Sequence, residues 1–286
     1  MITIHTVSEL RQLVSAAKAA GKTVGFVPTM GNLHAGHISL INQATANTDF
    51  VVSSIFVNPL QFNDKGDLER YPRTLGADQE KLTAAKCDVL FAPDVDEMYP
   101  DGQQGQTIVQ VPVVSEGLCG GSRPGHFDGV ATVVSKLLNM VQPDVAFFGQ
   151  KDFQQVAVIR KMVADLNLPI SIVSVPTMRA KNGLALSSRN GYLSAQELDT
   201  ATGLYKTLNA LAAELQQGKS IATSVENATK NLNAIGFRTD YIEVRRSHDL
   251  KPASASDTDL VIIAAAWLGS ARLIDNIELT LKPSGE

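Results

Sequence analysis

Apolar and polar positions follow two different periodicities along the first 176 residues. Short apolar runs, several rich in β-branched residues, predict buried strands at residues 23–28, 50–57, 88–92, 144–149 and 170–175. Between them, apolar residues at helical spacing predict helices at residues 7–20, 36–47, 74–86, 130–141 and 152–166. Strands that alternate with helices in this way predict an α/β fold, a doubly wound (Rossmann-like) parallel sheet.

Three local signals refine this pattern. Thr6 followed by Glu9 has the form of a capping box at the start of the first helix. Residues 107–111 predict an edge strand. Residues 117–128 are rich in glycine and predict a loop, either a linker or an active-site lid.

The pattern changes after Pro176. Two long helices are predicted at residues 194–217 and 220–235, followed by strands at 240–245, 259–267 and 271–279. Gly269-Ser270 predicts a tight hairpin between the last two strands. We therefore expect a Rossmann-like domain at residues 1–176 and a smaller α+β domain at residues 177–286.

The composition excludes several classes of protein. The net charge of −4 argues against a nucleic-acid scaffold, so an anionic substrate would have to meet a local cluster of positive groups. The longest apolar run, residues 260–268, is too short for a membrane span, and the N-terminal stretch lacks the pattern of a signal peptide. Cys87 and Cys119 do not form a disulfide framework, so a reducing cytoplasm is the expected location.

The segment Pro28–Leu40, PTMGNLHAGHISL, carries the clearest chemistry. A strand that leads through a glycine turn into a helix N-terminus forms an anion site, because the first helical amides point outward and the helix dipole favours negative charge. His34 and His37 lie one turn apart there, and Gly31 and Gly36 permit close approach of a ligand. The alternative is an ordinary pair of surface histidines.

Two further clusters have phosphate-binding chemistry. Gly149–Gln155, GQKDFQQ, follows a strand, with Lys151 suited to phosphate oxygens, Asp152 to capping the helix and Gln155 to a polar substrate. The alternative is a capped helix with a solvated lysine. Ser187–Asn190 supplies two hydroxyls and the fork of Arg189, or else forms a polar turn between domains.

Other candidates are weaker on their own. Asn58 and Gln61 follow a predicted strand, at the end of the sheet where ligands bind in this architecture. Arg123 could reach phosphate if its loop closes, or could face solvent. Asp78 could be an outer-sphere partner of Mg²⁺ or an ordinary surface carboxylate; Mg²⁺ itself would arrive mainly with nucleotide phosphates.

Taken together, six segments of the chain resemble the pantothenate synthetase (pantoate–β-alanine ligase) family, part of the HxGH nucleotidyltransferase superfamily. They occur in order and read PTMGNLHAGH, VNPLQF, YPRTL, GLCGGSRPGHFDGV, GQKDFQQ and LSSRN. The resemblance implies an ATP-dependent reaction in the route to coenzyme A. Pantoate and ATP form pantoyl adenylate and pyrophosphate, and β-alanine then displaces AMP to give pantothenate.

The resemblance also implies roles for residues and a homodimeric state. His34, His37, Lys151 and Arg189 would be catalytic, with His37 a proton donor. ATP would bind Met30, Gly31, Asn32, Leu33, His34, Ala35, Gly36, His37, Gly149, Gln150, Lys151, Asp152, Met178, Leu186, Ser187, Ser188 and Arg189. Pantoate and β-alanine would meet Gln61, Gln155, Asn58 and Arg123. That family commonly has a smaller, branched residue at position 178, so Met178 is expected to pack differently against adenine.

Two alternative functions fit the same motifs. A nucleotidyltransferase would join a nucleotide to a phosphorylated acceptor and would need no amine. A nucleotide-binding regulatory protein would keep the fold and lose catalysis. Pyrophosphate release, with and without β-alanine, separates these alternatives from the ligase.

Overall fold

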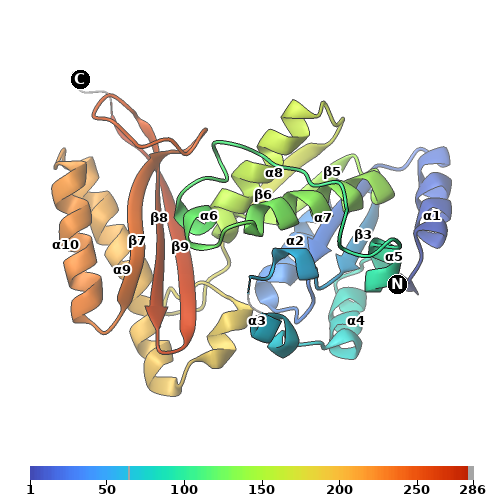
Figure 1. Ribbon diagram of the computed structural model, residues 1–286, viewed down its shortest axis with the longest axis horizontal. Coiled ribbons are helices and arrows are strands. Elements are labelled where there is room, and N and C mark those ends of the chain that lie inside the picture. The colour runs from blue at the N-terminus through green and yellow to red at the C-terminus, as the bar shows by residue number, and fades with distance from the viewer. Residues whose placement is uncertain (64, 283–286) are drawn as a thin grey trace. The chain divides into compact units, whose positions relative to one another are not determined.

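The computed structural model describes residues 1–63 and 65–282 of the chain, which divides into two compact units (Figure 1). The first unit contains Met1–Gln150 and Val158–Pro176, and the second contains Lys151–Ala157 and Thr177–Glu286. Separate clusters of buried apolar side chains are present in the two units.

A six-stranded sheet forms the centre of the first unit. Its strand order is β1-β4-β3-β2-β5-β6, and every pairing is parallel. The strands are β1 (Ile2–Ile4), β2 (Val24–Thr29), β3 (Phe50–Ile55), β4 (Val89–Phe91), β5 (Val145–Gly149) and β6 (Ser171–Val175). The predicted doubly wound parallel sheet is confirmed. The short strand β1 was not predicted from the sequence of its three residues.

Helices cover both faces of this sheet. Residues next to each other in β2 point to opposite faces, and Val27 lies in the buried cluster with Leu40 and Ile41 of α2, while Phe26 is buried outside that cluster. Helix α2 contacts α4, and α1 contacts α7. The helical elements before residue 166 are α1 (Val7–Ala19), α2 (Ala35–Asn47), η1 (Pro59–Gln61), α3 (Lys65–Arg70), α4 (Leu75–Ala84), α5 (Val95–Met98), α6 (Leu118–Ser122), α7 (His126–Val141), η2 (Gln150–Asp152) and α8 (Phe153–Asp165).

The capping box predicted at the first helix is present. The Thr6 hydroxyl accepts a hydrogen bond from the Glu9 amide at 3.3 Å, and the Glu9 carboxylate accepts one from the Thr6 amide at 3.1 Å. The Thr6 hydroxyl also donates to the Glu9 carboxylate at 2.7 Å, and this bond, with the one from the Thr6 amide, lowers the pKa of the Glu9 carboxyl below its ordinary value. The box satisfies two amides that the helix itself leaves without partners.

Two expectations for the middle of the chain are wrong. Residues 107–111 have irregular backbone instead of an edge strand, and the Val109 amide donates to the Thr132 hydroxyl of α7 at 3.0 Å. Part of the glycine-rich segment 117–128, expected as a loop, is helical, since it contains α6 and the first turn of α7. At residues 107–111, pairing with a neighbouring helix outweighs the local pattern.

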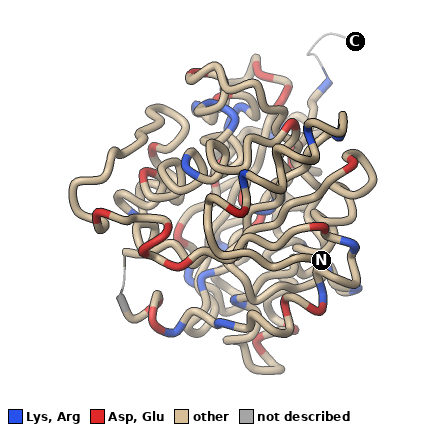
Figure 2. Tube along the Cα trace, turned by 90° about the vertical axis from the view of Figure 1, so that its right-hand side faces the viewer, with Lys and Arg blue, Asp and Glu red and all other residues tan. Residues whose placement is uncertain are grey.

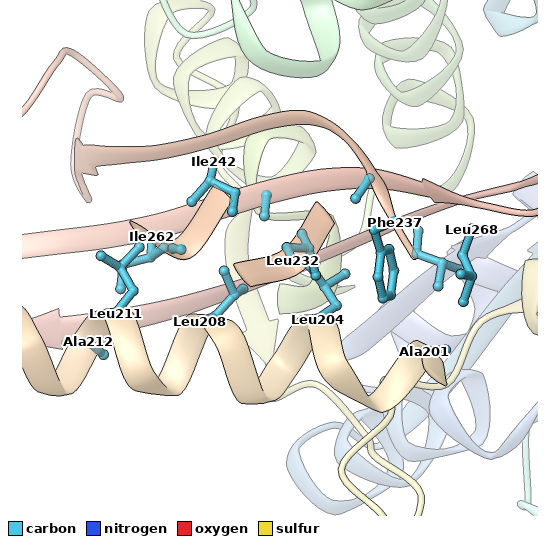
Figure 3. Packing of buried hydrophobic residues seen from close by; sticks show 14 of the residues in the cluster. Ala201, Leu204, Leu208, Leu211, Ala212, Leu232, Phe237, Ile242, Ile262 and Leu268 are labelled. Atoms are coloured by element: carbon cyan, nitrogen blue, oxygen red, sulfur yellow. The ribbon is translucent and has the colours of Figure 1, made fainter. Parts of the chain in front are cut away.

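The second unit contains the antiparallel sheet β7-β8-β9 and two long helices. Leu204, Leu208 and Leu211 of α9 point toward the strands and pack in one buried cluster with Ile242 and Ile262 (Figure 3). The predicted hairpin at Gly269-Ser270 is present, and the smaller α+β domain is confirmed. The elements are η3 (Ser188–Tyr192), α9 (Ala195–Gln216), α10 (Ile221–Ala234), β7 (Arg238–Arg246), β8 (Asp259–Leu268) and β9 (Ala271–Thr280).

Helix α7 approaches η1 so closely that a side chain would not fit between them. A Cβ atom built at Gly129 would lie 2.4 Å from the Leu60 carbonyl oxygen and 2.8 Å from the Gln61 nitrogen. Both neighbours are backbone atoms, which cannot rotate away. Glycine at position 129 therefore sets the position of the η1 backbone, including that of Gln61.

We expect Gly129→Ala to lower the free energy of unfolding by about 1–3 kcal/mol, the usual cost of forcing extra volume into a packed site. The measurement is the urea midpoint of the full chain. Gly76→Ala in α4 is the matched control, because a Cβ there meets nothing within 4 Å. Equal midpoints for the two variants would contradict this account of Gly129.

Candidate functional site

In the sheet of the first unit, the side on which successive strands are placed changes between β2 and β5. Strands β3, β4 and β1 lie on one side of β2, while β5 and β6 lie on the other. Ligands in doubly wound folds bind beyond the carboxyl ends of the strands at such a point. Three candidate segments follow the adjacent strands β2, β3 and β5: residues 30–37, 58–61 and 149–150.

The turn after β2 has a backbone that few side chains tolerate. Gly31 and Asn32 have φ of +81° and +51°, in the left-handed region favoured by glycine and asparagine. A buried carboxylate holds the amides at this point: Asp78 accepts from the Asn32 amide at 2.9 Å and from the Leu33 amide at 2.8 Å. Asp78 is fully buried. A charged acceptor on α4 therefore fixes the start of the turn.

Two further α4 contacts complete this clamp. The Thr74 hydroxyl donates to Asp78 at 3.0 Å, and the Lys81 ammonium donates to the Leu33 carbonyl at 2.6 Å. The alternative of a surface carboxylate at position 78 is wrong, because the side chain is buried. Both carboxylate oxygens accept backbone hydrogen bonds, so the contacts support a role in holding the turn rather than a role at Mg²⁺.

His34 and His37 are held at the N-terminus of α2 by the main chain. His34 is the N-cap residue, and its Nδ1 accepts from the Gly36 amide at 3.1 Å. The Nδ1 of His37 accepts from the His34 amide at 3.2 Å. The ring centroids lie 4.1 Å apart. Because each Nδ1 accepts a hydrogen bond, the neutral form of each ring carries its proton on Nε2.

The side chain of Gln61 is oriented by a buried polar chain. Tyr99 donates to Asn58 Oδ1 at 2.7 Å, and Asn58 Nδ2 donates to Gln61 Oε1 at 3.2 Å and to the Gly129 carbonyl at 3.1 Å. Burial raises the pKa of Tyr99 to about 12, so its hydroxyl keeps the proton that it donates. Gln61 Nε2 lies 2.9 Å from Met30 Sδ. The segments after β2 and β3 therefore meet through these two side chains.

Arg123 and His126 hold the backbone of the same residue. His126 Nδ1 donates to the Gln61 carbonyl at 2.9 Å, and the Arg123 guanidinium donates to it at 3.3 Å. Since His126 Nδ1 is the donor, its Nε2 accepts from Arg123 Nη1 at 3.1 Å. Sequence reasoning missed His126 and Tyr99; both are contacts distant in sequence, and only the GHF segment beside Arg123 hinted at one of them.

In the second unit, two candidate segments surround one small cavity. Lys151 and Ser187 line it together with Asn190, Tyr205 and Asp275. The loop before η3 is closed on itself, because the Leu186 amide donates to the Met178 carbonyl at 2.9 Å. The Arg189 amide donates to the Ser187 hydroxyl at 3.2 Å. The structure thus brings Lys151 and the serine-rich loop to one place.

The other candidates of this unit differ in exposure. Asp152 is exposed in η2, and Gln155 is half-buried on α8. Met178 is exposed. Ser188 and Arg189 are half-buried at the start of η3.

Charge, hydropathy and the grouping of metal-ligating side chains each add one observation. Acidic and basic residues are interspersed along the trace (Figure 2). Within residues 1–63 and 65–282, no helix is both long enough and apolar enough to cross a bilayer. A group of three or more His, Cys, Asp or Glu side chains able to hold a metal ion is likewise absent from these described residues.

Comparison with known proteins gives a consistent result over the whole chain. The family model described as "Pantoate-beta-alanine ligase" matches residues 2–278. A curated relative named pantothenate synthetase, from Pseudomonas fluorescens (strain Pf0-1), is 61% identical over 282 residues, which cover 98% of this chain and 99% of the relative.

Two solved structures agree with this match. The crystal structure of pantothenate synthetase from Thermus thermophilus aligns with a TM-score of 0.89 and 46% identity, covering 97% of this chain and 99% of that chain. A pantoate-beta-alanine ligase from Francisella tularensis, described as complexed with beta-gamma ATP and beta-alanine, aligns with a TM-score of 0.81 and 35% identity, covering 97% of each chain.

The clamp at Asp78 is testable through stability. Asp78→Asn keeps the volume but offers one acceptor oxygen to two backbone amides, so one amide then faces an NH₂ group. We expect the free energy of unfolding to fall by about 1.5–3 kcal/mol, the worth of a hydrogen bond to a charged group.

The measurement is urea unfolding, with Asp101→Asn at an exposed position as the matched control. An unchanged midpoint for Asp78→Asn would contradict the clamp.

Proposed function

The chain belongs to the pantoate–β-alanine ligase family. We therefore propose that it carries out the ATP-dependent joining of pantoate and β-alanine through a pantoyl adenylate. The observation that carries this proposal is the pair of imidazoles held by main-chain amides at the helix N-terminus beside the β2–β5 switch point. An anchored donor pair beside outward-pointing amides suits a polyphosphate whose charge shifts during reaction.

The first step is an in-line displacement at phosphorus. A carboxylate oxygen of pantoate bonds to the α-phosphorus of ATP, the bond to the β-phosphate oxygen breaks, and pyrophosphate leaves with that electron pair. Such a step needs positioning and stabilisation of charge more than a protein nucleophile. Met30–His37, Gly149 and Gln150 are the ATP-binding residues that we propose in the first unit.

His37 and His34 act in this step as donors from Nε2. The Nδ1 atoms accept from the Gly36 and His34 amides, so each neutral ring presents an N–H at its other nitrogen. A hydrogen bond from His37 Nε2 to a phosphate oxygen would strengthen as negative charge develops there. This arrangement supports the proton-donor role proposed for His37, with His34 beside it.

Gln61 is the proposed contact for pantoate. Its Oε1 accepts from Asn58 and its Nε2 donates one hydrogen toward Met30 Sδ, so the second hydrogen of the NH₂ group is proposed to donate to an acid such as pantoate. Asn58 is almost fully buried and Arg123 contacts the Gln61 carbonyl. Their contacts favour a role in holding Gln61 over direct binding of the substrate. Gln155 is proposed as the second pantoate contact.

The second unit supplies the remaining proposed contacts. Lys151, Asp152, Met178 and residues 186–189 would bind ATP, with the Lys151 ammonium and the Arg189 guanidinium countering phosphate charge. In the second step the β-alanine amine attacks the pantoyl carbonyl carbon, the bond to the AMP oxygen breaks, and the amine loses a proton. In domain terms, residues 1–176 would bind ATP and pantoate, and residues 177–286 would act as a lid.

Mg²⁺ is proposed to enter with the phosphates of ATP. Mg²⁺ keeps several waters and binds through few protein carboxylates. Asp78 does not fit this ion, since two backbone amides and a hydroxyl already donate to its oxygens. We derive no step through the metal.

Two further properties are proposed from the family and the composition. The chain is proposed to be a homodimer, which size-exclusion chromatography with light scattering would report as twice the chain mass of 30.6 kDa. A cytoplasmic location is proposed from the sequence, whose two cysteines do not make a disulfide framework.

The reaction is tested by supplying pantoate, β-alanine and ATP to the purified protein. We expect AMP and pyrophosphate in equal amounts, with pantothenate formed only when β-alanine is present. ADP as product, or no turnover, would overturn the proposal. Accumulation of an adenylated product that needs no amine would favour the nucleotidyltransferase, and ATP binding without pyrophosphate release would favour the regulatory protein.

The role of His37 is tested by His37→Ala. Loss of one donor to the transition state should lower kcat for pyrophosphate release by about 10²–10³. His248→Ala is the matched control, because that side chain is 68% exposed on the second unit. A rate near that of the wild type, in a variant with an unchanged circular dichroism spectrum, would remove His37 from this role.

A further inference from the structure

Strand β9 carries two neighbouring buried polar residues near its middle. Asp275 and Asn276 are only 3% and 5% exposed. Neighbouring residues on a strand point to opposite faces. Asp275 falls in the same alternating series as Leu273 and Leu279, which belong to the buried apolar cluster of the second unit, so Asn276 faces the other side.

On the first face, Asp275 holds the loop that precedes η3. The two carboxylate oxygens accept from Arg179 at 2.6 and 2.8 Å. The guanidinium of Arg179 lies 3.6 Å from the centre of the Tyr205 ring and also donates to the Gly183 carbonyl at 3.2 Å. Arg179 and Ala185 are paired as a β-bridge. The loop that ends in the Ser187 segment is therefore fixed to β9 at its base.

On the second face, Asn276 holds the segment that contains Lys151. Asn276 Nδ2 donates to the Lys151 carbonyl oxygen at 2.9 Å. The two faces are linked through the main chain, because the backbone N–H of Asn276 donates to Asp275 Oδ1 at 2.8 Å. Lys151, Ser187 and Asp275 line one cavity. Two adjacent residues of one strand thus tie together two segments that are about 36 positions apart in the sequence, from 151 to 187.

Packing alone does not account for this pair. A buried carboxylate and a buried amide both cost desolvation, and an apolar residue at position 275 would extend the apolar cluster at lower cost. Placement of phosphate-binding groups does account for it, since a shift of about 1 Å in such a group can cost a hundredfold in rate.

We propose that Asp275 and Asn276 are positioning residues, which set the Lys151 backbone and the Ser187 loop in the arrangement that binds ATP. This inference rests on the proposed function, because it assigns the two segments to the nucleotide. Asp275 acts through Arg179, and Asn276 acts through the carbonyl of Lys151.

The test is Asn276→Leu, which keeps the approximate volume and removes the donor. Losing one hydrogen bond of ordinary strength should raise the KM and the Kd for ATP by about threefold to tenfold. The KM for pantoate and the thermal midpoint should change much less. Thr280→Val is the matched control, because it removes a side-chain hydrogen bond of 3.0 Å to Asp259 from the same strand.

Arg179→Lys is the second variant. It keeps a positive charge beside Asp275 but loses the bidentate fork and the flat contact with Tyr205. Like Asn276→Leu, it should weaken ATP binding. The proposal therefore stays testable if the leucine variant does not fold.

The two measurements separate a failure of the proposed function from a failure of the positioning role. Wild-type pyrophosphate release tests the proposed function, while calorimetric ATP binding by the folded variants tests the positioning role without pantoate. Wild-type ATP affinity in both variants would overturn the inference. Equal losses in ATP affinity, pantoate KM and thermal midpoint would also overturn it, because that pattern marks a purely structural role.

Discussion

The buried carboxylate of Asp78 is the contact on which the site of the first unit depends. It holds the amides of Asn32 and Leu33 in a turn with left-handed backbone, directly after the central strand β2. That turn sets where α2 begins and therefore where its N-terminal amides and two histidines lie. Met30, at the start of the turn, contacts Gln61 after the neighbouring strand. An acceptor on α4 thus organises two loops that it does not belong to.

A second constraint is the use of main-chain amides to fix side chains. The Nδ1 atoms of both His34 and His37 accept from the backbone, so one set of contacts caps the helix and selects the imidazole nitrogen that faces outward. Gln61 is fixed similarly, with its carbonyl held by His126 and its side chain by Asn58. If these side chains act as proposed, they lose little conformational freedom when substrate binds, which favours catalysis by positioning.

Local pattern was sufficient for five of the six strands of the parallel sheet, for the long helices and for the strand–turn–helix around His34 and His37, since each depends on periodicity or turn chemistry within a few residues. It failed for Asp78, because the partners of that carboxylate lie about 45 residues away in sequence and a buried acidic residue on α4 has the same local pattern as an exposed one. The strand expected at residues 107–111 failed for a related reason: the Val109 amide pairs with Thr132 of α7. Asp275 and Asn276 also gave no signal, because their partners are in other segments.

The absence of a side chain at position 129 allows α7 to contact the η1 backbone directly, next to Gln61, the proposed pantoate contact. The carbonyl of Gly129 accepts from Asn58, and its Cα lies against the backbone of Leu60 and Gln61. Any redesign that enlarges or shifts the η1 loop, which is proposed to bind the acid, would therefore have to rebuild the helix behind it at the same time. Acceptance of a bulkier hydroxy acid should thus be sought in paired libraries that vary η1 and α7 together, rather than in substitutions of single lining residues.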